Sequence, residues 1–210
     1  MARIRLRLHG LAWERGGRRR VLRPDPLVAE AGQTAVVVAD DPADVEAFTD
    51  VVLGLAWPIR GTIHLADREI TTSTPLERGI GLVPAGGCLA PHLTVEQNIA
   101  FGLRRSRAGR RAHIGFVADR LKIGGLRLRP HQVSPDERLR VALARAVCGH
   151  SLPNAMVIED RAGRHPCEAA VSSMRSYPDL PVLVVSDSDA RGAALAAPSD
   201  RWKIVDADEP

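Results

Sequence analysis

Short apolar runs, each closed by polar or turn residues, recur along the whole chain. Residues 3–8 alternate arginine with isoleucine or leucine, the period of two expected for a half-exposed strand. Residues 34–39 (TAVVVA) form a continuous apolar run, as expected for a strand covered on both faces. Five further runs predict strands in the same way: GTIHLAD (61–67), GIGLVPA (79–85), NAMVIED (154–160), PVLVVSD (181–187) and RWKIVDA (201–207).

Helical spacing of apolar residues falls between these runs, notably over residues 42–55 and 136–147. Strands that alternate with helices predict an α/β fold with a largely parallel sheet. Residues 91–150 contain helical segments and no convincing strand, so a helical subdomain is expected there. The stretch 104–111, rich in arginine and glycine, is predicted to be a loop or a helix end.

Composition narrows the class of protein. The chain has 210 residues, 45% hydrophobic and 26% charged, which is ordinary for a globular protein with one sizeable core. No apolar run is long enough to span a bilayer. No secretory signal is recognisable, and three widely spaced cysteines without a C-x-x-C pair predict reduced thiols in the cytoplasm.

The net charge of +4 comes from arginine, since Lys122 and Lys203 are the only lysines. Arginines cluster over residues 3–7, 15–23 and 104–111. A nucleic-acid or anionic-lipid surface is one interpretation, and a solvated basic face is the simpler one. Because only 3% of residues are aromatic, little stacking surface exists for single strands, and nucleic acid is not the expected partner.

Three longer segments carry a family resemblance: GLAWPIRGTIHLADREI (54–70), RGIGLVPAGGCLAPHLTVEQNIAFGL (78–103) and RPHQVSPDERLRVALARAV (129–147). Their order and spacing resemble the nucleotide-binding subunit of ATP-binding cassette (ABC) transporters, particularly bacterial importers. The resemblance implies a P-loop NTPase-like fold: a mostly parallel sheet with an antiparallel N-terminal edge and an inserted helical subdomain. It predicts one domain over residues 1–210, with the core at 1–87 and 151–210 and the helical subdomain at about 88–150.

The positions that carry chemistry in this family are altered here. A working phosphate loop, G-x-x-x-x-G-K-[ST], uses glycines for close backbone approach, lysine to neutralise phosphate and Ser/Thr to hold Mg²⁺. The nucleotide-site positions of the family, from the phosphate loop through the glutamine and the signature to the switch histidine, correspond to Ala39, Asp44, Val45, Glu46, Ala85, Ser134 and Asp187. Of the signature, matched to residues 133–137, only the serine is retained. The Walker B carboxylate pair is reversed, as Glu159 and Asp160, and no catalytic residue is assigned.

Helix capping explains the acidic turn at residues 40–46. A helix start has free N–H groups and a positive dipole end, which a carboxylate can satisfy as well as a phosphate. Asp41 is the expected N-cap of the helix, with Pro42 at its first position and Asp44 completing a variant capping box. Ser134 and Glu137 have the S-x-x-E spacing of the box itself. Both helix starts that would face ATP thus carry their own caps.

Two further features keep two interpretations each. Trp13 lies roughly where the family places an adenine-stacking aromatic, although a tryptophan packed on the sheet or exposed at the surface explains it more simply. Three of the four predicted strand ends carry acidic residues, which would form a negative pocket if they converge. Such carboxylates could hold a divalent cation. Solvated acids and helix caps require fewer assumptions, so no metal site is assigned.

The sequence therefore predicts a pseudo-ATPase: a scaffold or regulator of an ABC transporter, with no cofactor of its own although Mg-ATP is the family ligand. Its expected partners are a membrane permease, a second ABC ATPase subunit, or both. The expected location is the cytoplasm, peripheral to the inner face of the cell membrane. A weak or atypical Mg-ATP-binding ABC ATPase that uses Glu159 and Asp160 is the alternative, and an arginine-rich nucleic-acid-binding module is a third.

Overall fold

The computed structural model describes residues 5–101, 103, 107–149, 152–195 and 200–207. Within these residues, strands β1 to β10 form one mixed sheet in the order β6-β5-β1-β2-β10-β4-β9-β8-β7, with β3 paired to β1. The strands are β1 (Arg5–Arg15), β2 (Arg18–Arg23), β3 (Leu27–Glu30), β4 (Thr34–Val38), β5 (Arg60–Leu65), β6 (Arg68–Glu69), β7 (Ile80–Val83), β8 (Ala155–Asp160), β9 (Val182–Ser186) and β10 (Arg201–Asp206).

The parallel part of the sheet consists of β10, β4, β9, β8 and β7. The strands around β1 and β2 are antiparallel and form the N-terminal edge that the resemblance implies. Each apolar run read from the sequence overlaps a strand, although residues 3 and 4 of the first run lie outside the described residues. Strands β2, β3 and β6 were not predicted from the sequence. In β2, which reads RRRVLR, the arginines hide the apolar pattern.

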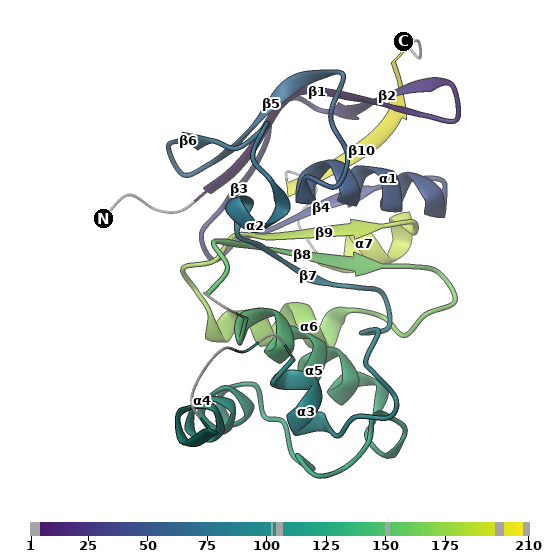
Figure 1. Ribbon diagram of the computed structural model, residues 1–210. Coiled ribbons are helices and arrows are strands. Elements are labelled where there is room, and N and C mark those ends of the chain that lie inside the picture. The colour runs from purple at the N-terminus through teal and green to yellow at the C-terminus, as the bar shows by residue number, and fades with distance from the viewer. Residues whose placement is uncertain (1–4, 102, 104–106, 150–151, 196–199, 208–210) are drawn as a thin grey trace.

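The helices are α1 (Pro42–Leu53), α2 (Pro75–Arg78), α3 (Val95–Ile99), α4 (Arg107–Arg120), η1 (Pro130–Gln132), α5 (Pro135–Val147), α6 (Glu168–Ser173), η2 (Met174–Ser176) and α7 (Asp189–Leu195). Figure 1 shows α1 on one side of the parallel strands, and α3, α4, α5 and α6 on the other. The described part of 91–150 is helical and contains no strand, as predicted. Residues 107–111 begin α4, whereas 104–106 lie outside the described residues.

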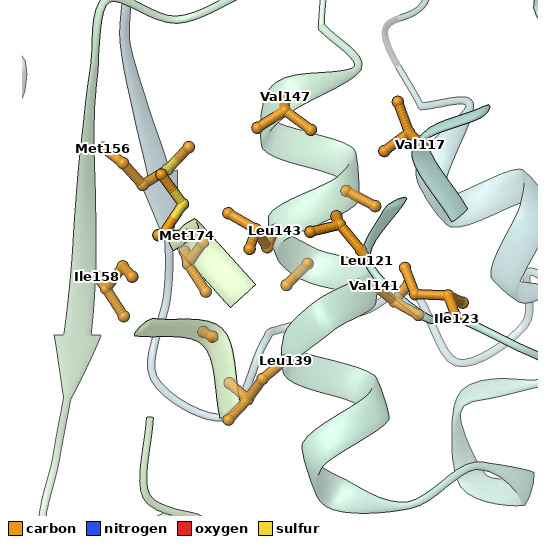
Figure 2. Close-up of a cluster of buried hydrophobic side chains, with 14 of the residues drawn as sticks. Val117, Leu121, Ile123, Leu139, Val141, Leu143, Val147, Met156, Ile158 and Met174 are labelled. Atoms are coloured by element: carbon orange, nitrogen blue, oxygen red, sulfur yellow. The ribbon is translucent and has the colours of Figure 1, made fainter. Parts of the chain in front are cut away.

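Two buried clusters fill the space on the two sides of the sheet. One joins α1 to the antiparallel strands and includes Trp13, Phe48 and Val157. The other joins α3 to α6 and includes Leu143 and Ile158. Val157 and Ile158 are neighbours in β8, so their side chains point to opposite faces. Figure 2 shows α5 in the middle of the second cluster, between the sheet on one side and the α4 region on the other. No helix among the described residues is long and apolar enough to cross a membrane.

Candidate functional site at the carboxyl ends of the parallel strands

The start of α1 follows β4 directly and carries the cap expected from the sequence. Asp41 has extended backbone angles, and its Oδ1 accepts a hydrogen bond from the Ala43 N–H at 2.8 Å. Pro42 occupies the first helical position, where no N–H is needed. The hydrogen bond from Ala43, assisted by Arg15, lowers the pKa of the Asp41 carboxyl. A side-chain anion therefore already occupies this helix start.

Asp44 does not complete the predicted capping box. Its side chain is fully buried, and its carboxylate pairs with Arg15 at 3.2 Å and with Arg20 in a shorter contact. A buried carboxylate is costly unless it is paired, and a charged partner stabilises it more than a second helix N–H would. The carboxylate has therefore turned from the helix terminus towards two arginines of the antiparallel strands.

The two arginines come from the β1–β2 hairpin. Gly16 and Gly17 form its two-residue loop, and both have positive φ values, as a type I′ turn requires. This loop brings Arg15 over α1, where its second nitrogen also contacts Asp41 Oδ2 at 2.9 Å. The sequence analysis identified these arginines only as part of a basic cluster. The Gly-Gly pair between two β-like segments was the signal that could have placed them.

Arg20 links the α1 start to the last strand. Its Nη1 lies 2.9 Å from Asp206 Oδ1 in β10, so one guanidinium bridges Asp206 and the buried Asp44. Burial by itself would lower the pKa of Arg20, but the hydrogen bonds to Asp206 and Asp44 outweigh burial and raise it. The guanidinium thus stays charged inside a closed network.

Lys203 is a further cation that the fold brings to this turn. It lies far away in sequence, but β10 pairs in parallel with β4 and places Lys203 beside Val38. Its Nζ lies 3.1 Å from Asp40 Oδ2. No lysine is near the acidic turn along the chain, and the pairing of β10 with β4 brings Lys203 to it in space.

Arg161 is another such cation, and it lies between Glu46 near the start of α1 and Glu159 near the end of β8. The Nη2 atom of Arg161 is 3.8 Å from Glu46 Oε2 and 3.7 Å from Glu159 Oε1. In the correspondence that the family resemblance implies, Glu46 takes the position of the Ser/Thr that holds Mg²⁺, and Glu159 takes the first Walker B position. A guanidinium therefore lies between the two side chains that correspond to metal-contacting positions.

Asp160, the second carboxylate of β8, faces the other side of the sheet. Its side chain is buried, and it accepts hydrogen bonds from Ser186 Oγ at 3.0 Å and from the Cys167 N–H at 3.3 Å. Arg191 of α7 forms a close ion pair with it. Burial is the leading cause of the raised pKa of Asp160, and the contacts with Ser186 and Arg191 oppose that rise. Successive strand residues alternate faces, so Glu159 and Asp160 do not meet at one point.

Most of the carboxylates expected to gather at the strand ends lie in ion pairs within the described residues. Five of the carboxylates gathered there have a cationic partner, in the pairs Asp40–Lys203, Asp41–Arg15, Asp44–Arg20, Glu159–Arg161 and Asp160–Arg191, whereas Asp187 accepts a backbone hydrogen bond from Ala162. Among the described residues, no group of three or more His, Cys, Asp or Glu side chains is arranged to hold a metal ion. The sequence analysis counted the acids near the strand ends and not the bases that the fold brings to them.

The remaining sequence-derived positions lie nearby, in contacts within the fold. Ala39 directly follows β4 and donates its N–H to the Ser186 carbonyl, and Val45 is fully buried in the cluster that includes Trp13 and Phe48. Ala85 approaches Glu159 through its backbone N–H at 3.4 Å. Asp187 accepts a hydrogen bond from the Ala162 N–H at 2.6 Å and so ties down the loop after β8.

The start of α5 is capped but lies on the other side of the sheet from α1 (Figure 1). Ser134 accepts a hydrogen bond from the Glu137 N–H at 3.1 Å, as predicted. Glu137 does not return the bond to the cap. Its carboxylate accepts from the Gly124 N–H at 2.9 Å, because the neighbouring loop offers a free donor. The predicted S-x-x-E box is therefore half formed.

Trp13 has a packing role. Its side chain is 1% exposed, and its ring lies 5.3 Å from that of Phe48 in α1, centroid to centroid. The simpler of the two interpretations, a tryptophan packed on the sheet, is confirmed.

The ABC transporter family model matches residues 47–152, which is about half of the chain. The chain belongs to the ABC transporter family. The putative 2-aminoethylphosphonate import ATP-binding protein PhnT of Salmonella typhimurium is 29% identical over 187 residues, which cover 84% of this chain and 50% of the relative. The sn-glycerol-3-phosphate import ATP-binding protein UgpC of Escherichia coli is 30% identical over 151 residues, 70% of this chain and 42% of the relative. The ABC chain thus spans about half the length of the curated relatives it matches.

Solved structures agree on the fold of this ABC chain. The cassette MJ0796, described as a dimeric bacterial ABC transporter cassette, aligns with a TM-score of 0.64 over 90% of both chains at 16% identity. The structure of cbiO1 from Clostridium perfringens aligns with a TM-score of 0.66 over 88% of this chain and 78% of that one, at 18% identity. At such identities the likeness establishes the ABC ATPase fold alone. The mixed sheet with its antiparallel edge and inserted helices is confirmed.

Proposed function

We propose that this ABC chain is a non-catalytic subunit, a pseudo-ATPase that serves an importer-type ABC transporter as a scaffold or regulator. The observation that carries the proposal is the α1 start, where Asp44 is buried against Arg15 and Arg20. Carboxylates fill the anion position at the helix terminus, and arginines fill the role of the phosphate-loop lysine. A polyphosphate at this helix start would have to displace the Asp41 carboxylate, which accepts the Ala43 N–H and pairs with Arg15.

The positions that would contact Mg²⁺ support the same proposal. Mg²⁺ bound to ATP would contact the positions of Glu46 and Glu159, between which Arg161 already lies. A guanidinium and a divalent cation repel each other, so the residues present do not fit a magnesium-bound nucleotide. Asp160, at the position of the family's general base, is held on the opposite face by Arg191.

The segment that would dock on a permease is well built. Thr94 caps α3 in a reciprocal box with Gln97. Asn98 is buried, and its amide group exchanges hydrogen bonds with the backbone of Ala90 at 2.8 and 3.1 Å. Phe101 directly after the helix is 69% exposed. An ordered segment that presents an aromatic side chain fits a retained docking surface. We therefore assign a permease, at the inner face of the cell membrane, as the partner, with a second ABC subunit as a further one.

The alternative is an Mg-ATP-binding ABC transporter ATPase of weak or atypical activity. It is favoured by the relatives, which carry the names of import ATP-binding proteins. In that case Arg161 and the Asp44 network would have to rearrange when nucleotide binds.

Thermal unfolding with and without millimolar Mg-ATP separates the two functions. A ligand at a hundredfold its dissociation constant adds about 2.7 kcal/mol to the stability of the folded state. We expect no shift for the wild-type chain with ATP, with Mg²⁺ or with both. Arg161→Gln is the matched variant, because it removes the internal cation and leaves the α1 start intact. A shift in the wild type that requires both Mg²⁺ and ATP would contradict the proposal and establish the alternative.

A further inference from the structure

A cavity of about 540 Å³ opens at the end of the molecule where α4 meets the segments that lead into β8 and β9. It shares no residue with the acidic turn or with the carboxylates of β8. Its volume falls within the range of about 300–1,000 Å³ that is typical of small-molecule sites. Four separate parts of the chain converge on it: α4, the end of α5, residues 152–154 and residues 177–180.

The cavity has an apolar floor and an apolar mouth. Val117 of α4 and Val147 of α5 line it and belong to the buried cluster drawn in Figure 2. Phe116 and Leu152 line it as well, with exposed fractions of 61% and 56%. Large apolar side chains left in water at the rim of a concave site are the usual sign of a binding surface. An apolar ligand body would cover both.

A cation is held rigidly at the wall of this cavity. Arg120 donates from two nitrogens to the Ser176 carbonyl, from Nε at 2.7 Å and from Nη2 in a shorter bond. Its guanidinium lies 4.8 Å from the centroid of the Tyr177 ring and 6.0 Å from that of Phe116. A guanidinium has five N–H donors, so capacity for an acceptor remains.

No carboxylate of the described residues lies within ion-pair distance of Arg120. The other titratable groups that line the cavity are His113 on α4, Tyr177 and Asp179. A fixed guanidinium without an acidic partner, next to an apolar space, is suited to a ligand that brings its own anionic group.

We propose that this cavity binds a small organic acid: an apolar chain or ring that covers Phe116 and Leu152, with one carboxylate directed at Arg120. The site stands apart from the nucleotide positions, so it does not depend on whether the chain binds Mg-ATP. A ligand here would touch α4 and the strand-leading segments at once, and so join the inserted helices to the sheet.

Titration calorimetry of the full chain with decanoate, below its micelle concentration, tests the proposal. Decanol and decylammonium serve as neutral and cationic counterparts of equal chain length. We expect saturable binding of decanoate, at least about tenfold weaker binding of decanol, and the weakest binding of decylammonium. Leu152→Glu should abolish decanoate binding, and Arg120→Met should reduce it to the level of decanol.

Leu76→Glu is the matched control, since Leu76 is 84% exposed on α2 and does not line the cavity. It should leave decanoate binding unchanged. Leu152 is itself exposed, so Leu152→Glu remains informative even if Arg120→Met loosens the packing of α4. Absence of saturable binding, equal binding of all three amphiphiles, or decanoate binding that survives Leu152→Glu would each overturn the proposal.

Discussion

Near the start of α1, the carboxylate of Asp44 is buried against two arginines of the β1–β2 hairpin. Asp44 has no exposed surface, and the positive charge that it needs comes from Arg15 and Arg20 of the hairpin. Removing one partner of such a group leaves an uncompensated buried charge, which costs far more than a surface ion pair contributes.

Arg20→Met should therefore lower the free energy of unfolding by about 3 kcal/mol, because Asp44 would lose its closer partner. The double variant Arg20→Met with Asp44→Leu should be less destabilised than the sum of the two single variants, since neither charge is then left behind. Urea unfolding of the four chains measures this coupling. Arg18→Met is the control, because the Arg18 side chain is 76% exposed and its ion pair with Asp206 is long, at 3.7 Å. Additive single effects would contradict the network.

Asp41 makes the helix start sensitive to acid. Its pKa is lowered in the folded chain, first by the Ala43 hydrogen bond and then by Arg15. A lowered folded pKa means that the ionised form contributes stability above the ordinary value of 3.8, and that this contribution is lost as the pH falls through the folded value.

Asp41→Asn keeps a capping oxygen and removes the charge. The wild type should exceed this variant in melting temperature by a constant amount above about pH 5, and the difference should shrink as the pH falls below about 4. Asp41→Ser should behave like Asp41→Asn, because it too caps without a charge. A difference that is independent of pH would show that the charge of Asp41 contributes nothing.

At the scale of elements, α1 is fixed at its far end by a buried arginine. Arg78, in α2, has no exposed surface and donates to the carbonyls of Val51 at 2.7 Å and Val52 at 2.8 Å. It also donates to Thr71 at 2.6 Å. The last carbonyls of a helix have no partner within the helix, so this side chain satisfies them. Gly54 ends α1 in the left-handed region with a φ of 82°, and a Cβ there would lie 2.6 Å from Arg78 Nε.

Arg78→Met keeps much of the volume and removes every donor. We expect it to lower the free energy of unfolding by about 3 kcal/mol, because several buried carbonyls lose their partners at once. Arg68→Met removes one exposed hydrogen bond, to Glu77, and should cost less than about 1 kcal/mol. Thermal and urea unfolding compare the two. Equal effects would mean that the α1 end draws no special stability from Arg78.

At the scale of the whole molecule, ion pairs join residues that lie far apart in the sequence. Arg20 and Asp206 are joined across the β2–β10 pairing, and Lys203 meets Asp40 because β10 lies beside β4. Some arginines of the basic clusters that suggested a nucleic-acid surface are thus paired with carboxylates inside the fold. At this scale the sheet order decides which acids and bases meet.

The two faces of the sheet also divide the functional positions. Glu159 faces the α1 layer and pairs with Arg161, whereas Asp160 faces the layer of α6 and α7 and pairs with Arg191. Reading the two carboxylates as one motif joins side chains that the pleat of β8 separates.

The sequence by itself determined the parallel strands, helices α1 and α5, and the caps at Asp41 and Ser134, because apolar periodicity and capping are local properties. It also indicated the ABC family through the order of three segments. Only the tertiary structure decided the partners of Asp44, the place of Arg161 between Glu46 and Glu159, and the neighbour of Asp40.

 These contacts join residues far apart in sequence, and such pairings depend on strand order and on which face of the sheet a side chain takes. Neither is recorded in the local pattern, since a one-residue change of register moves every side chain of a strand to the other face.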